Sequence, residues 1–273
     1  MIIPVSKYHG CGNDFVIAAM NDVCSFDLSA FAIAVCDRHT GIGADGFIAV
    51  KQDPFEMVFY NQDGSRAPMC GNGIRCFAAY CMDEHLCENT CFDVETLAGI
   101  QEVEITENPP YWVSVDMGLP KEDLSLLGIK EPIWGKEVTV STGQQVTLYS
   151  IFMGTIHTVV FTPHDSFDLA KVGKEICEHP LFAYETNVNF VEIIDETQMN
   201  IRTYERGVGM TLACGTGACA SLICGHRLQR LGKQVVAHLP KGELQLSIES
   251  DGHVKMRGPA VRIMKGVYEY EGN

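Results

Sequence analysis

Basic residues are scarce in this chain of 273 residues. Lysine and arginine number 20 against 35 aspartates and glutamates, so the formal net charge is −15. An acidic surface repels both the phosphate backbone of nucleic acids and anionic membranes. We therefore expect neither nucleic acid nor a membrane as a partner. A site for an anion has to be built locally, from helix N-termini or a well-placed arginine.

Long apolar runs are also missing. No segment approaches the ~20 residues that a transmembrane helix needs. The first ten residues do not join a basic region to an apolar stretch, as a signal peptide does. The sequence thus predicts a soluble, cytoplasmic protein. Its contents of 46% hydrophobic and 20% charged residues are those of a packed globular protein.

Cysteines are plentiful, but none are spaced as metal-binding cysteines usually are. No two of the 12 cysteines form a Cys-x-x-Cys pair, which disfavours a structural zinc site. A disulfide framework is disfavoured in a cytoplasmic protein. Most of the cysteines should therefore be small buried side chains. We expect neither a metal nor a cofactor.

Strand-like stretches recur between turn signals, whereas helical patterns are few. Strands are expected at residues 14–19, 46–50, 55–60, 112–116, 137–140, 158–161, 188–193, 199–204 and 243–248. Helices are expected at residues 28–36, 73–82, 168–178 and 217–231. Many strands with few helices indicate the α+β class.

The chain is expected to form two halves, residues 1–117 and 118–273. The segment 108–122 is the best candidate for the crossing between them, because it contains Pro109-Pro110 and Gly118-Leu-Pro. The pattern leaves open whether the last strand returns to the first half.

One motif occurs twice. When residues 57–73 are set beside residues 201–217 without a gap, Cys70 falls on Cys214. Tyr60 falls on Tyr204, and each cysteine begins a Cys-Gly-X-Gly sequence. Each copy reads as a strand, a turn-rich loop, the cysteine motif and a helix. The repeat predicts two similar halves that each offer one cysteine.

A cysteine at the start of a helix suits proton transfer. The positive end of the helix favours the thiolate, and such positions lower the pKa of cysteine from ~8.5 to roughly 3.5–7.5. We expect the glycines to let the backbone turn sharply, so that its N–H groups bind a substrate carboxylate. Two such thiols facing each other can invert the configuration at a carbon: a thiolate removes a proton from one face, and a thiol delivers one to the other.

Other functions are less consistent with the pair. A single Cys-Gly-X-Gly sequence is also found as a buried turn or as a fragment of a phosphate loop. Neither copy completes the Gly-x-Gly-x-x-Gly or the Gly-x-x-x-x-Gly-Lys-Ser/Thr motif, so nucleotide binding is disfavoured. A cysteine hydrolase needs a partner base, and the sequence identifies none for either thiol.

Several stretches, in order, resemble the diaminopimelate epimerase family. They are His9-Gly-Cys-Gly-Asn-Asp-Phe, Asp37-Arg-His-Thr-Gly-Ile-Gly-Ala-Asp-Gly, Tyr60-Asn-Gln-Asp-Gly-Ser, Met69-Cys-Gly-Asn-Gly-Ile-Arg-Cys, Thr186-Asn-Val-Asn-Phe-Val and residues 205–220. The resemblance implies cofactor-independent interconversion of LL- and meso-diaminopimelate. It also implies a homodimer of two-domain chains. Each domain is then an antiparallel sheet curled around a central helix, and the site lies in the cleft between the domains.

The resemblance also implies roles for single residues. Cys70 and Cys214 match the catalytic pair. Donors around the reacting carboxylate match Gly71, Asn72, Gly215 and Thr216. Substrate-holding residues match Asn13, Asn61, Asn187 and Arg206, the last three at the distal end of the substrate. Glu205 matches an acid that orients substrate ammonium groups.

One departure concerns the substrate. Where the family usually reads Gly-Asn-Pro-His, this chain has Gly154-Thr155-Ile156-His157, so His157 is kept as a possible supporting residue. Thr155 stands where an asparagine helps to hold the distal end. Diaminopimelate remains the favoured substrate, and racemisation of another amino acid such as histidine is the alternative. A more distant alternative is an inactive homologue that only binds an amino acid.

Overall fold

The computed structural model describes residues 1–107 and 110–271. Asn108 and Pro109, at the start of the expected crossing segment, lie outside the described residues. The chain divides into two compact units. The first comprises Met1–Val115 and Gly258–Asn273, and the second comprises Asp116–Arg257.

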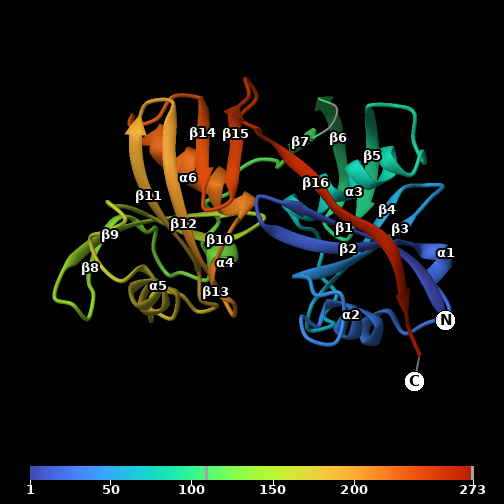
Figure 1. Cartoon of the computed structure of the whole chain (residues 1–273). Helices are drawn as coiled ribbons and strands as arrows, with labels where there is room; N and C mark the ends of the chain where they lie inside the picture. The colour runs from blue at the N-terminus through green and yellow to red at the C-terminus, as the bar shows by residue number, and fades with distance from the viewer. Residues whose placement is uncertain (108–109, 272–273) are drawn as a thin grey trace. The chain divides into compact units, whose positions relative to one another are not determined.

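The first unit is a mixed sheet with helices between its strands (Figure 1). Its strands follow one another as β1 (Ile2–Gly10), β2 (Asn13–Ala19), β3 (Gly46–Lys51), β4 (Glu56–Asn61), β5 (Cys91–Thr96), β6 (Gly99–Glu107) and β7 (Tyr111–Asp116). Its helices are α1 (Met20–Val23), α2 (Leu28–Cys36) and α3 (Gly71–Asp83). The later part of β16 (Val254–Glu269) flanks β1, with Val261 opposite His9.

The second unit repeats this plan. Its sheet runs through β8 (Trp134–Thr139), β9 (Gln145–Met153), β10 (Thr155–Phe161), β11 (Asn187–Asp195), β12 (Gln198–Glu205), β14 (Gln234–Leu239), β15 (Gly242–Ile248) and the first residues of β16. The short β13 (Gly209–Thr211) pairs with β12. Its helices are α4 (Leu124–Leu127), α5 (Leu169–Cys177) and α6 (Gly215–Arg227).

The α+β class is confirmed, but the sheets are not wholly antiparallel as expected. In the first unit β2 pairs with β3 in parallel and β4 with β5 in parallel. In the second unit β10 pairs with β11 and β12 with β14 in the same way. The physical reason is that a helix crosses over between the members of each pair, and such a crossover returns the chain in the same direction.

A buried helix lies at the centre of each unit. Helix α3 contacts β1, β2, β3 and β6, whereas α6 contacts β9, β10, β11 and β15. These two sets occupy equivalent places in the two strand orders. Most residues of both helices are buried, including Phe77 and Leu222 at 0% exposure. The expected arrangement of a sheet around a central helix is therefore present in each unit.

The central helices begin earlier than the sequence predicted. They start at Gly71 and Gly215, directly after the two cysteines, instead of at residues 73 and 217. The α6 helix also ends at Arg227, before the expected end at residue 231. Helix α2 matches its expected span, because Asp27 accepts hydrogen bonds from the N–H groups of Ser29 and Ala30 and fixes its start.

Candidate active site

Both repeated cysteines are the residues that immediately precede a central helix. The backbone at Cys70 is extended (φ −136°, ψ 124°), and that at Cys214 is nearly the same (φ −129°, ψ 106°). The first helical hydrogen bonds run from Ile74 N to Cys70 O and from Ala218 N to Cys214 O. Within the described residues neither thiol caps its own helix. Each thiol therefore lies at the positive end of a buried helix, where an anion is stabilised.

The motif glycines provide space instead of a sharp turn, which corrects the sequence analysis. None of the four has a positive φ, because all lie within the first helical turn. A Cβ on Gly217 would lie 2.2 Å from Asn189 Oδ1 and 3.3 Å from Cys214 Sγ. A Cβ on Gly215 would lie 2.8 Å from Met256 Sδ. These glycines allow neighbouring side chains to approach the helix start.

Gly217 should tolerate alanine much less well than Gly73. A methyl group on Gly217 would overlap Asn189 Oδ1, and overpacking of this kind costs roughly 1–3 kcal/mol. Gly73→Ala is the matched control, because its nearest neighbour is Ile48 Cδ1 at 3.3 Å, the end of a flexible side chain. Urea unfolding of both variants measures the difference. An equal loss of stability in the two would contradict the packing of Asn189 against Gly217.

Asn13 lies beside Cys70 in the first unit. Cys70 Sγ is 3.7 Å from Asn13 Oδ1, and Asn72 Nδ2 donates to the same oxygen at 3.0 Å. Asn13 Nδ2 donates to Asp45 Oδ2 at 2.7 Å. Asp45 forms an ion pair with Arg38 at 2.8 Å. The structure thus brings together Cys70, Asn13 and Asn72, three of the residues that the resemblance implied.

Arg75 orients the amide of Asn72. The Arg75 side chain is fully buried, and its Nη2 donates to Asn72 Oδ1 at 2.8 Å. Its Nη1 donates to Gly71 O at 3.0 Å. Because Asn72 Oδ1 receives this bond, Asn72 presents its N–H group to Asn13. Arg75 and Asp45 lie within the motif stretches but were not singled out from the sequence.

Thr216 joins His157 to Cys214 in the second unit. His157 Nε2 is 2.9 Å from Thr216 Oγ1, and Thr216 Oγ1 is 3.5 Å from Cys214 Sγ. His157 is fully buried, and burial lowers its pKa to about 3. The imidazole is therefore neutral near pH 7. The Thr216 hydroxyl therefore lies between His157 and Cys214.

Asn189 contacts the other side of the His157 ring. Its Nδ2 lies 3.2 Å from His157 Nδ1, and Thr203 Oγ1 donates to its Oδ1 at 3.1 Å. The sequence analysis missed Asn189. The available signal was the alternation of strand β11, in which Asn187 and Asn189 point to the same face of the sheet.

The residues assigned to the distal end of the substrate lie in both units. In the second unit, Asn187 Oδ1 accepts from Arg206 N at 2.9 Å. Arg206 Nη1 donates to Tyr184 O at 2.7 Å, and Glu205 Oε1 accepts from the Thr211 hydroxyl at 2.6 Å. In the first unit, Asn61 ends β4 and donates from Nδ2 to Ser65 Oγ at 2.9 Å.

Thr155 begins β10, two residues before His157. The preceding Gly154 has a φ of 72°, a left-handed conformation that favours glycine. A Cβ on Gly154 would lie 3.5 Å from Thr216 Cγ2, so this turn packs next to the first turn of α6. The segment in which this chain departs from the usual family motif therefore lies next to the helix start that follows Cys214.

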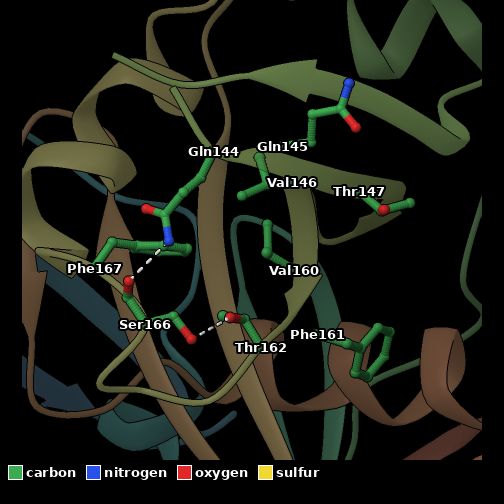
Figure 2. Close-up of a pocket in the computed structure, with 9 residues that line it drawn as sticks. All are labelled: Gln144, Gln145, Val146, Thr147, Val160, Phe161, Thr162, Ser166 and Phe167. Carbon is green, nitrogen blue, oxygen red and sulfur yellow. Dashed lines mark hydrogen bonds between the residues drawn. The ribbon is translucent and has the colours of Figure 1, made fainter. Parts of the chain in front are cut away.

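A hollow of about 380 Å³ lies elsewhere on the second unit (Figure 2). It is lined by residues of β9 and β10 and by the segment that follows β10, where Thr162 donates to Ser166 Oγ. None of the site residues predicted from the sequence lines it. Its chemistry is that of amide, hydroxyl and apolar groups.

Within residues 1–107 and 110–271, no group of three or more histidine, cysteine, aspartate or glutamate side chains is placed to hold a metal ion. None of the described helices has the length and apolar character to span a membrane.

Comparison with known proteins decides the family. The diaminopimelate epimerase family model matches residues 5–122 and 149–263. The diaminopimelate epimerase of Alkaliphilus metalliredigens is 40% identical to this chain over 98% of each protein, and that of Bacillus cytotoxicus is 39% identical over 97% of each. This chain belongs to the diaminopimelate epimerase family. The resemblance read from the motifs is thereby confirmed.

Solved structures agree at the level of the fold. A hydroxyproline epimerase from Agrobacterium vitis superposes with a TM-score of 0.69 at 13% sequence identity, covering 98% of this chain and 91% of that one. The segments matched to the diaminopimelate epimerase family contain all the candidate site residues. By contrast, residues 144–147 at the hollow of Figure 2 lie between the two matched segments.

Proposed function

We propose that this chain is a cofactor-independent diaminopimelate epimerase that uses Cys70 and Cys214 as its two proton carriers. The observation that carries the proposal is the placement of both cysteines at the starts of equivalent buried helices. Its support is membership of the diaminopimelate epimerase family, in which three relatives named for this activity are 37–40% identical to this chain.

In the proposed reaction one cysteine is a thiolate and the other a thiol. The thiolate takes the α-proton from one face of the substrate carbon, and its S–H bond forms as the C–H bond breaks. The electron pair spreads onto the reacting carboxylate. The thiol then delivers its proton to the opposite face, and the configuration at that carbon is inverted.

The helix starts have a second task in this proposal. The first-turn N–H groups of α3 and α6 have no carbonyl partner within their own helix, so they suit a negatively charged oxygen. We assign the backbone of Gly71, Asn72, Gly215 and Thr216 to the reacting carboxylate. Negative charge increases on that group as the proton leaves, so these donors stabilise the transition state more than the substrate.

The distal end of the substrate carries a carboxylate and an ammonium. We assign Arg206 to the carboxylate, since a guanidinium can donate two parallel hydrogen bonds to it. Glu205 supplies the counter-charge for an ammonium group, and Asn61 and Asn187 hold the substrate through their amides. Asn13, which contacts Cys70, belongs to the reacting end.

A histidine racemase is the second candidate, and Thr155 and Ile156 are the observation that favours it. If the substrate is diaminopimelate, Thr155→Asn restores the usual distal contact and leaves kcat/KM unchanged or higher. If the substrate is histidine, the added amide crowds the pocket, and kcat/KM should fall by about 10–100-fold. Assays of wild type and variant with both substrates decide this.

The control for this assay is Thr139→Asn, the same substitution at an exposed position of β8. Histidine turnover by the wild type far above diaminopimelate turnover would overturn the first choice. Activity on neither amino acid would favour the binding-only homologue.

We also propose that two such chains form a homodimer in the cytoplasm. The division at residues 117 and 118 is kept as a proposal for two epimerase halves, with the later part of β16 returning to the first half. Support for two equivalent halves comes from the repeated strand order and from the two central helices of equal length. Size-exclusion chromatography with light scattering tests the dimer.

A further inference from the structure

We infer that Asn189 is a positioning residue for proton transfer at Cys214. It holds the His157 ring with its proton on Nε2, so that the Thr216 hydroxyl is turned to donate to the Cys214 sulfur. The inference deepens the proposed function and rests on it for its role in catalysis. The ring orientation itself can be measured without a substrate.

The orientation of the Asn189 amide follows from its other contacts. Its Nδ2 lies 3.5 Å from Thr158 O, and a carbonyl oxygen can only accept a hydrogen bond. Its Oδ1 accepts from the Thr203 hydroxyl at 3.1 Å. The nitrogen of Asn189 is therefore the atom 3.2 Å from His157 Nδ1. An amide N–H donates, so Nδ1 must be the bare nitrogen of the ring.

The state of the His157 ring follows from its burial. The residue is fully buried, which lowers its pKa to about 3 and keeps it neutral. A neutral imidazole carries one proton, and Asn189 leaves only Nε2 for it. Nε2–H then donates to Thr216 Oγ1, which lies 2.9 Å away.

Thr216 transmits this arrangement to the sulfur. Its oxygen accepts the histidine proton, so its own hydroxyl hydrogen is available to donate to a second group. Cys214 Sγ lies 3.5 Å from that oxygen. An O–H donor directed at sulfur stabilises the thiolate over the thiol, and a thiolate is the form that removes a proton.

Gly217 supports this series of contacts from Asn189 through His157 and Thr216 to Cys214, which we call the relay. The amide oxygen of Asn189 lies only 2.2 Å from the place that a Cβ on Gly217 would occupy. The second glycine of the motif thus makes room for Asn189. At the same place in the first unit, Gly73 has Ile48 and Cys70 as its nearest neighbours. The relay belongs to Cys214, and Cys70 has Asn13 instead.

The first experiment determines the protonation state of the His157 ring directly. Nitrogen-15 NMR of the unliganded protein, with the His157 signals assigned by their loss in His157→Gln, reports which ring nitrogen carries the proton. The expected result is a proton on Nε2 and a bare Nδ1 near neutral pH. A proton on Nδ1, or a doubly protonated ring, would overturn the inference whatever the activity of the protein.

The second experiment measures the reactivity of the Cys214 thiol. Mass spectrometry measures the rate of iodoacetamide alkylation at Cys214, with Cys70 in the same molecule as an internal control. Thr216→Val removes the hydroxyl and should slow alkylation of Cys214 by about threefold to tenfold, whereas Thr216→Ser keeps the hydroxyl and should keep the rate. Asn189→Leu should act like Thr216→Val without altering Cys70. An unchanged rate in Thr216→Val would contradict the relay.

Three outcomes separate this inference from the proposed function. A protein with the expected ring state and alkylation rates that epimerises nothing would refute the proposed function but keep the relay. An active epimerase with a proton on His157 Nδ1 would support the proposed function but refute the relay. If Asn189→Leu fails to fold, the wild-type NMR measurement and the Thr216 pair still decide.

Discussion

Replacement of Cys70 or Cys214 by alanine is expected to lower kcat for epimerisation by roughly 10²–10⁴-fold, the contribution that one positioned acid or base makes. Either loss should be this large, because in the proposed mechanism each cysteine performs a different half of the inversion. The double variant should be little worse than either single one, since residues that act as a unit are not additive. Initial rates of diaminopimelate inversion measure all three.

Cys87→Ala is the control for this prediction. Cys87 lies after the end of α3 and donates to Asn89 O at 3.4 Å, in a segment without site residues. Its removal should change kcat by less than a few-fold. If either cysteine variant retained full activity, the assignment of two proton carriers would be wrong.

Arg206→Lys should lower kcat/KM for diaminopimelate by roughly 10–100-fold, which corresponds to the 1.5–3 kcal/mol of a charged hydrogen bond. Arg206 Nη1 is held by Tyr184 O at 2.7 Å, so the rest of the guanidinium can face a carboxylate. Lysine offers a point charge and cannot make the two-pronged contact. The backbone bond from Arg206 N to Asn187 is retained, so the fold should persist.

Arg202→Lys provides the matched substitution. Arg202 lies on strand β12, which ends one residue before Arg206, and it is outside the candidate site. Steady-state kinetics of the two variants, with their thermal unfolding, make the comparison. Equal kinetic losses at the two positions would show that Arg206 does not hold the substrate. A loss of stability confined to Arg206→Lys would point to a structural role instead.

The sequence was most informative where chemistry and local structure coincide. The Cys-Gly-X-Gly repeat predicted two equivalent helix starts, and both are present at Cys70 and Cys214. Helix α2 was predicted over its full span from its apolar pattern, and the structure shows that an aspartate directly before it caps its start. These features depend on interactions within a few residues.

Features set by distant contacts were missed. Strand β6 was not predicted, because most of its residues are exposed and polar and only Val103 and Ile105 reach the core. The parallel pairing of β2 with β3 could not be read from strand patterns, since it depends on the path of the chain through α2.

Side-chain orientation was the other limit. Asn187 could be proposed because it lies in a recognised motif, whereas the role of Asn189 depends on three contacts with other strands. Arg75 is a similar case. A charged residue within a helical pattern is usually exposed, and only the structure shows it to be fully buried and bonded to Asn72.

The central claim is inversion by two separate proton carriers, and the most direct test is epimerisation of LL-diaminopimelate by the purified protein in D₂O. The account predicts that, early in the reaction, the meso product carries one deuterium at the inverted carbon while the remaining LL substrate carries almost none. This follows because the group that delivers the new proton is not the one that took the old. Product that retains the substrate's own hydrogen, or deuterium that enters both isomers equally from the start, would contradict the account.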